Sequence, residues 1–150
     1  MNAILRGALS GIVATVPMTV PIIVARRTGL IGTTPPVQIS ANIAARTPLL
    51  PERRHEGFPA TWIVAHFGYG AACGTVYALA APALPPVPAV KGLIFGELVW
   101  AVSYLGYLPA MKLYPAPDDD APPRTIVMIA AHAVFGLALG QVEHRLRSRR

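Results

Sequence analysis

The stretch "ALSGIVATVPMTVPIIVA", residues 8–25, contains no charged side chain. A hydrocarbon core about 30 Å thick is crossed by a helix of roughly 20 apolar residues, whereas a strand would leave backbone groups unpaired in lipid. The stretch therefore predicts a membrane-spanning helix. A secretory signal peptide is the alternative, but this run is longer than a usual signal core, and Arg26 and Arg27 follow it directly.

Two prolines, Pro17 and Pro21, lie inside this first span. A proline lacks the N–H that would pair with the carbonyl four residues earlier, and membrane helices tolerate this where another group satisfies the backbone. We expect the hydroxyls of Thr15 and Thr19 to bond to the carbonyls that the two prolines leave free.

Composition extends the membrane assignment to the whole chain. Apolar residues make up 53% of it and charged residues 13%, against about 25% charged in soluble domains. Three further runs, residues 62–81, 92–111 and 125–142, hold one acidic residue among them, Glu97. The sequence therefore predicts a single all-α domain over residues 1–150, an integral membrane four-helix bundle with spans at about 8–25, 62–81, 92–111 and 125–142.

The loops between these spans are polar and rich in proline. In the first, "TTPPVQISANIAAR", residues 33–46, predicts a short helix at the membrane surface with Thr34 as its N-cap. An irregular loop folded over the helices is the alternative. In the third, Asp118, Asp119 and Asp120 stand between prolines, and we expect a solvated loop there because no spaced ligands or glycine turn frame a cation.

Basic residues bear on the orientation. They are nearly balanced between the two faces, six against seven, but the tail at residues 143–150 carries the densest cluster. Cytoplasmic loops usually hold the excess of basic residues, so we expect both termini to be cytoplasmic in an inner membrane. Basic residues that meet lipid headgroups account for the net charge of +6. The expected partner is therefore the lipid bilayer, and no nucleic acid is expected.

Each predicted span carries two glycines four residues apart, with Gly7 directly before the first span. Glycines at this spacing open a groove on one helix face, where a second backbone can approach closely. We therefore interpret these residues as helix-packing positions. They are Gly7 and Gly11, Gly70 and Gly74, Gly92 and Gly96, and Gly136 and Gly140.

The glycine pairs also indicate an internal repeat. Spans one and three begin with "RGALSG" at residue 6 and "KGLIFG" at residue 91, and spans two and four share a His-x3-Gly-x3-Gly frame. Two similar helical hairpins would then be related by an axis along the membrane normal. Chance glycine spacing is the alternative explanation.

His66 and His132 open the two shared frames and lie on the glycine faces, because positions four residues apart drift little around a helix. A histidine inside a span is either a functional group or a hydrogen-bonding group that holds two helices in register. The functional interpretation makes the pair cofactor-binding, with haem or a metal ion between the imidazoles. Cys73, the only cysteine, is too far along the helix to be a good third ligand.

Glu97 begins a second candidate polar site, because Trp100 and Tyr104 follow it on one helix face. An intramembrane acid can carry protons or bind a cation. A neutral, hydrogen-bonded glutamic acid, or one that reaches headgroup water, is the alternative.

No nucleophile with a base, phosphate loop or dinucleotide fingerprint is present, so the sequence predicts no enzyme. We expect a small scaffold or accessory subunit that packs through its glycine faces against itself or another membrane protein, since four grooves exceed what one small bundle must bury. The haem or metal carrier and the proton or ion pathway are the competing hypotheses.

The runs "HFGYGAACGTVYALA", "GLIFGELVWAVSYLGYLPAMKLYP" and "HAVFGLALG" resemble small bacterial inner-membrane proteins of the YagU-like type and related uncharacterised four-span families. The resemblance covers roughly residues 60 to 140. It implies a polytopic bacterial membrane protein and no particular chemistry. The positions that match its pattern are His66, Glu97, Trp100, Tyr104, Pro109 and His132.

Overall fold

A computed structural model of the chain describes residues 1–46 and 59–148, and every regular element in those residues is helical. Four helices are long and apolar enough to cross a membrane, which confirms the four predicted spans. The chain runs through α1 (Ala3–Arg27), α2 (Pro35–Ala44), α3 (Pro59–Ala80), the 3-10 turn η1 (Ala81–Ala83), α4 (Pro88–Ala101), the π-helical segment η2 (Val102–Tyr107), α5 (Leu108–Ala110) and α6 (Pro122–Ser148).

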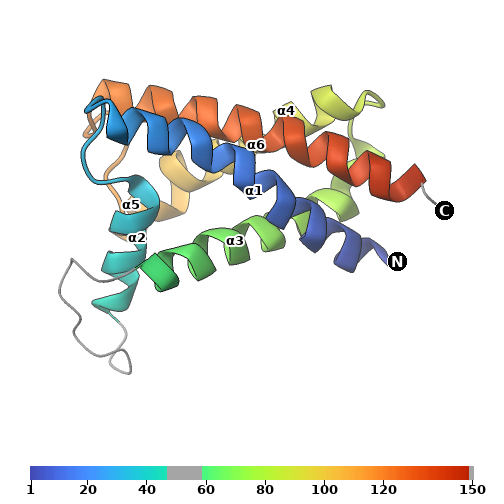
Figure 1. The fold of residues 1–150 in the computed structure, drawn as a ribbon, viewed down its shortest axis with the longest axis horizontal. Helices are drawn as coiled ribbons and strands as arrows, with labels where there is room; N and C mark the ends of the chain where they lie inside the picture. The colour runs from blue at the N-terminus through green and yellow to red at the C-terminus, as the bar shows by residue number, and fades with distance from the viewer. Residues whose placement is uncertain (47–58, 149–150) are drawn as a thin grey trace.

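The two termini lie at the same end of the long helices, while α2 lies at the other end (Figure 1). Four successive crossings require this arrangement. The basic tail at residues 143–150 continues α6 as far as Ser148, and residues 149–150 lie outside the described part of the chain. The middle of the first loop, residues 47–58, lies outside it as well, including Arg53 and Arg54 from the orientation argument.

Helix α1 begins where the side chain of Asn2 accepts a hydrogen bond from the N–H of Leu5 at 2.8 Å. Within α1, however, the threonine hydroxyls do not reach the carbonyls that the prolines free. Thr15 donates to the carbonyl of Gly11 and Thr19 to the carbonyl of Thr15, both at 2.8 Å. The expectation for the two prolines was therefore wrong, and the threonines instead turn their oxygens toward α3.

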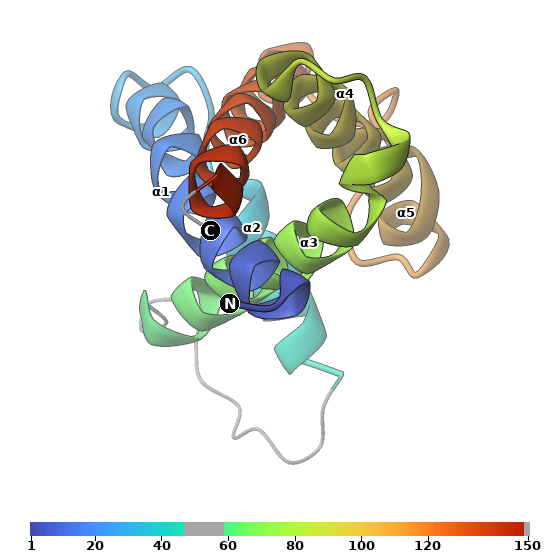
Figure 2. The ribbon, with the colours of Figure 1, turned by 90° about the vertical axis from the view of Figure 1, so that its right-hand side faces the viewer.

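The glycines of different spans face one another in pairs. Helix α1 packs against α3, helix α4 packs against α6, and α1 also lies along α6 (Figure 2). A Cβ added to Gly74 would lie 2.7 Å from the Cα of Gly11, and one added to Gly96 would lie 2.9 Å from the Cα of Gly136. Real Cβ contacts are essentially never shorter than 3.0 Å. The backbones therefore approach each other as closely as glycine permits.

Helices α3 and α4 have far fewer contacts with each other than either has with its glycine partner. The third span also differs from the continuous helix that its sequence predicts. Its helix widens into η2 at residue 102, and Gly106 has non-helical backbone angles. Pro109 follows in α5, where it has no backbone N–H to donate to the hydrogen bonds of the helix. This π-helical segment turns Ser103 and Tyr104 inward, so both are buried.

The predicted short helix in the first loop is present as α2. Its Asn42 donates to the backbone carbonyl of Leu113 at 2.8 Å, and Arg46, just beyond it, donates to the carbonyls of Met111 and Lys112. These bonds hold α2 against the turn that follows α5. The helix lies at the end of the long helices opposite the termini (Figure 1), where it also contacts α3.

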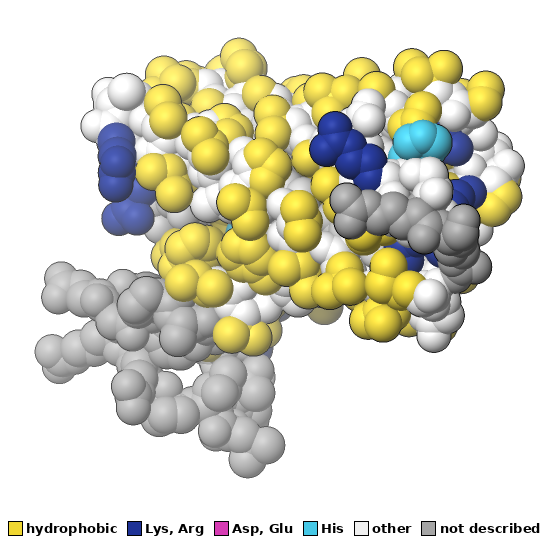
Figure 3. All heavy atoms as spheres, turned by 45° about the vertical axis from the view of Figure 1, so that its right-hand side comes forward, with side chains coloured by type: hydrophobic (Ala, Val, Ile, Leu, Met, Phe, Trp, Pro, Cys, Tyr) yellow, Lys and Arg dark blue, Asp and Glu magenta, His cyan; other side chains and the backbone are white. Residues whose placement is uncertain are grey.

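Much of the surface is apolar (Figure 3). Large aliphatic side chains are exposed along the outward faces of α1, α4 and η2, among them Val16, Val20, Val24, Leu98, Val102 and Leu105. A water-soluble monomer rarely exposes an apolar surface of this extent. Lipid is the solvent that suits these faces.

Candidate functional site

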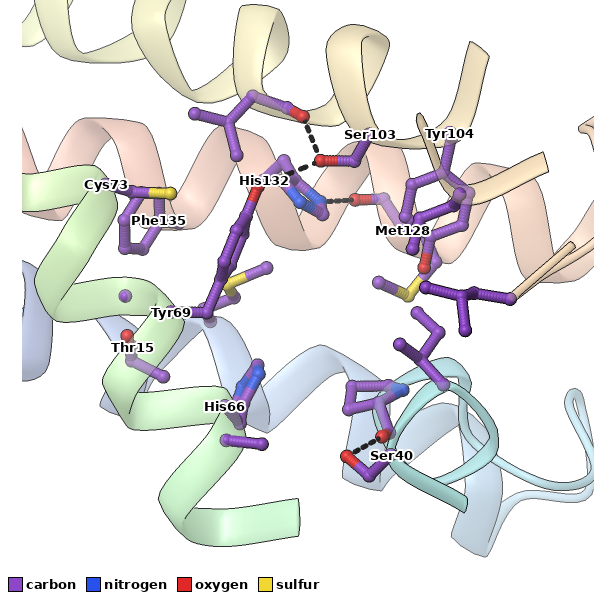
Figure 4. A pocket seen from close by; sticks show the side chains of 18 of the residues that line it. Thr15, Ser40, His66, Tyr69, Cys73, Ser103, Tyr104, Met128, His132 and Phe135 are labelled. Atoms are coloured by element: carbon purple, nitrogen blue, oxygen red, sulfur yellow. Dashed lines mark hydrogen bonds between the residues drawn. The ribbon is translucent and has the colours of Figure 1, made fainter. Parts of the chain in front are cut away.

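A cavity of about 360 Å³ lies among the spans, on the side where α3 and α4 separate. Its wall is mostly apolar and includes residues from α1, α2, α3, α4, η2 and α6, as well as Leu113. Ligand pockets range from about 300 to 1,000 Å³, so this volume suits a small molecule or part of a larger one. His66 and His132 both line it, and Figure 4 shows them on different walls of the same space.

His132 is 4% exposed, and its Nδ1 lies 2.8 Å from the backbone carbonyl of Met128. A carbonyl oxygen only accepts, so Nδ1 carries a proton, and in the neutral imidazole Nε2 then carries the lone pair. Among the described residues, the hydrogen bond of this ring is the one through Nδ1. The helix that carries His132 thus fixes its tautomer and leaves one acceptor nitrogen for the cavity.

His66 is held in the opposite tautomer. Its Nε2 lies 3.3 Å from the hydroxyl of Thr19, whose single proton already bonds to the carbonyl of Thr15. Nε2 of His66 must therefore donate to the Thr19 oxygen, which in the neutral imidazole leaves the lone pair on Nδ1. In their neutral forms the two histidines together offer two acceptor nitrogens.

A chain of hydroxyl groups crosses from α3 to η2 beside the histidines. Ser103 donates to the carbonyl of Val99 at 2.6 Å, and this uses its only proton. Tyr69 must therefore donate to Ser103, at 3.1 Å, and Tyr107 donates to Tyr69 at 2.9 Å. Because the carbonyl of Val99 can only accept, it determines the donor in each of these hydrogen bonds. These bonds link the two helices where they have few backbone contacts.

Aromatic rings form another part of the wall. Tyr104 packs edge-on against His132, with ring centroids 6.1 Å apart, and stacks on Trp100 at 6.2 Å. Trp100 itself does not line the cavity, and its indole Nε1 is buried without a hydrogen-bond partner in the described part of the chain. Glu97 is half-buried, does not line the cavity, and makes no hydrogen bond or ion pair with the described residues. The predicted Glu97, Trp100 and Tyr104 stripe thus contributes only Tyr104 to the cavity.

Among the other predicted residues, Cys73 and Gly70 line the cavity. The remaining glycine positions lie at helix contacts instead. The thiol of Cys73 is buried, and no group of three or more histidine, cysteine or acidic side chains suited to a metal ion occurs in residues 1–46 and 59–148. The described residues thus hold no ready-made set of three ligands for a bare metal ion.

Sequence reasoning missed an ion-pair cluster at the end of the molecule that holds the termini. Oε1 of Glu143 accepts from Nε of Arg6 at 2.8 Å and from Nη2 of Arg147 at 2.9 Å. Arg6 and Glu143 are only 6% and 3% exposed. The signal was present in the sequence, because Glu143 is the residue that directly follows the predicted span 125–142. The cluster joins the start of α1 to the end of α6.

In the acidic third loop Asp118 and Asp119 are exposed, whereas Asp120 is half-buried. Asp120 accepts from the hydroxyl of Tyr114 at 2.9 Å and from Nη1 of Arg124 at 2.7 Å. Burial raises the pKa of Tyr114, so its hydroxyl keeps the proton that it donates. Asp120 is thereby used in a structural pair beside the buried Tyr104.

The whole chain, residues 1–150, matches the protein family described as "Family of unknown function (DUF6789)". The chain belongs to this family. The match supports the expectation of an uncharacterised family and gives no support for the YagU-like type in particular. Searches of curated proteins and of solved structures returned no match.

Proposed function

We propose that this DUF6789 protein binds a small, mostly apolar molecule inside the membrane, in the cavity that His66 and His132 line. The observation that carries the proposal is the pair of imidazoles, each held in one tautomer by the protein and each left with an acceptor nitrogen that no described residue uses. Ligand sites are typically apolar cavities with a few convergent polar groups, and this cavity has that character. A hydroxyl or N–H group of the ligand would donate to these nitrogens.

This proposal replaces the scaffold hypothesis as our first choice. The scaffold rested on glycine faces left over for a partner, and the eight glycines here contact other spans of the same chain. Self-association through other surfaces stays a prediction. The proposal assumes the arrangement of two hairpins in one bundle, in an inner membrane with cytoplasmic termini, as the sequence predicts.

Extraction of the purified protein tests the proposal. Val99 lines the cavity and Val102, on the same span, is 62% exposed to the outside. Val99→Trp should fill the cavity, whereas Val102→Trp adds the same indole on the lipid side. We expect mass spectrometry to find a compound that copurifies with the wild type and with Val102→Trp and is depleted in Val99→Trp. Equal retention by all three proteins would exclude this cavity as the binding site.

Haem is the second candidate, favoured by the same pair of nitrogens. Haem iron takes neutral imidazole as an axial ligand, and two free imidazole nitrogens facing one cavity fit that donor set. Haem would supply electron transfer or gas binding to the site. A Soret absorption band in the purified protein that shifts in His66→Phe and His132→Phe would support it, and a sample reconstituted with haem that shows no such shift would exclude it.

The proton or ion pathway through Glu97 has less support, since Glu97 does not line the cavity. Flux into proteoliposomes that falls in Glu97→Gln would restore that hypothesis.

A further inference from the structure

A second cavity, of about 390 Å³, adjoins the first. Its wall includes Arg26 and Arg27 at the end of α1 and Trp62 near the start of α3. His66 and Pro36 line both cavities, so the two spaces meet at these residues. A single elongated molecule would therefore pass from the second cavity, beside the imidazole of His66, into the first.

Arg26 and Arg27 are the charged part of the second cavity. Both side chains are exposed, and neither forms an ion pair or a hydrogen bond with the described residues. Other arginines of the chain are paired, Arg6 and Arg147 with Glu143 and Arg124 with Asp120. The second cavity thus presents two positive charges that no acidic side chain of residues 1–46 and 59–148 neutralises.

The position of these groups along the span places them at headgroup depth. Arg26 and Arg27 form the last turn of α1, and Trp62 lies at the start of the neighbouring span. Arginine and tryptophan at span ends sit at the boundary between the hydrocarbon and water. Guanidinium groups bind phosphate and carboxylate oxygens through paired N–H donors. An anionic group would therefore be held at the boundary, with the apolar cavity directly behind it.

We propose that the ligand is an anionic amphiphile, with a phosphate or carboxylate head between Arg26 and Arg27 and a chain that extends past His66 into the apolar cavity. This inference rests on the proposed function and adds the chemical class of the ligand.

The test uses three probes on protein in phosphatidylcholine nanodiscs. Dodecyl phosphate has head and chain, dodecanol has the chain without the charge, and inorganic phosphate has the charge without the chain. Binding is followed by the fluorescence of Trp62, which lines the second cavity, in a Trp100→Phe background. We expect dodecyl phosphate to bind best, and its affinity to fall as sodium chloride is added.

Arg26→Gln and Arg27→Gln should each weaken dodecyl phosphate binding about fivefold, and the double variant about 25-fold, at low salt. The charge-matched control is Lys112→Gln/Arg145→Gln, which removes two exposed charges that line neither cavity. Equal weakening by the control, or equal affinity for dodecanol, would overturn the proposal. Inorganic phosphate that binds as tightly as dodecyl phosphate would also overturn it, in favour of a free phosphate site.

The same titrations separate this inference from the function on which it rests. Here Val99→Phe fills the cavity without adding a second tryptophan to the fluorescence signal. If Val99→Phe abolishes binding of both chain-bearing probes while the arginine variants change nothing, the cavity binds apolar molecules and the anionic head is wrong. If Val99→Phe leaves dodecyl phosphate binding unchanged, the chain does not enter the apolar cavity, and both the proposed function and this inference fail.

Discussion

The imidazole Nε2 of His66 lies 3.3 Å from the hydroxyl oxygen of Thr19, on the helix that packs against its own. The Thr19 proton is committed to the carbonyl of Thr15. In this hydrogen bond the imidazole of His66 is therefore the donor and the hydroxyl oxygen of Thr19 is the acceptor. It determines which nitrogen of His66 remains available to a ligand.

Thr19→Val should release the tautomer of His66, because valine keeps the shape of threonine and removes the acceptor. In ¹⁵N spectra of histidine-labelled wild-type protein, we expect the proton on Nε2 of His66 and on Nδ1 of His132. The variant should mix the two forms at His66 and leave His132 as it was. Spectra in which both histidines carry the proton on the same nitrogen would contradict the assignment, and His66→Gln identifies the signal.

Gly74→Ala should destabilise the protein by about 1–3 kcal/mol, as expected when extra atoms are forced into a tight contact. A Cβ at Gly74 meets the backbone of Gly7 and Gly11, which cannot move aside as a side chain can. The measurement is the free energy of unfolding in mixed detergent micelles.

Gly68→Ala is the matched control on the same helix, since nothing lies within 4 Å of its added Cβ. Alanine favours helix over glycine by up to about 1 kcal/mol, so this variant should be neutral or slightly stabilising. Equal losses in both variants would mean that α1 and α3 do not meet at Gly74.

Glu143→Gln should lower the free energy of unfolding by about 3 kcal/mol, because it leaves the buried Arg6 without its counter-charge. Glu97→Gln makes the same chemical change within a span, at a side chain that pairs with none of the described residues, and should cost less than about 0.5 kcal/mol. Thermal unfolding of the two variants provides the comparison. A larger loss of stability in Glu97→Gln than in Glu143→Gln would show that Glu97 forms a stabilising contact that this structure does not contain.

The sequence was informative where the signal is local. Long runs with at most one charged side chain predicted all four spans, and proline and threonine before an amphipathic stretch predicted the helix at Pro35–Ala44. Lipid imposes helical structure on any such run, so little else had to be known. The glycine spacing indicated faces where backbones approach, but it does not say which faces meet, because that choice depends on contacts between distant spans.

The candidate site was only partly predictable for the same reason. His66 and His132 were singled out as intramembrane histidines, whereas Thr19 was assigned to a proline carbonyl that it does not reach. The widening of the third span into η2 has no sequence signal beyond Gly106 and Pro109. The cavity arises from that widening together with the separation of α3 from α4. The spacing of apolar residues along a single helix predicts neither feature.

The hydroxyl chain between α3 and η2 leads to a last prediction. Tyr69→Phe removes the bonds to both Ser103 and Tyr107, whereas Tyr107→Phe removes only the outer one. Hydrogen bonds between membrane helices contribute on average about 0.6 kcal/mol each, so Tyr69→Phe should cost about twice as much stability as Tyr107→Phe. Because α3 and α4 have few other contacts, we also expect Tyr69→Phe to increase the distance between spin labels placed at Val76 and Leu93, two exposed residues on these helices. Tyr107→Phe is the control, since it keeps the bond between Tyr69 and Ser103. Unchanged label distances in Tyr69→Phe, measured by electron paramagnetic resonance, would mean that the hydroxyl chain does not hold the two helices together.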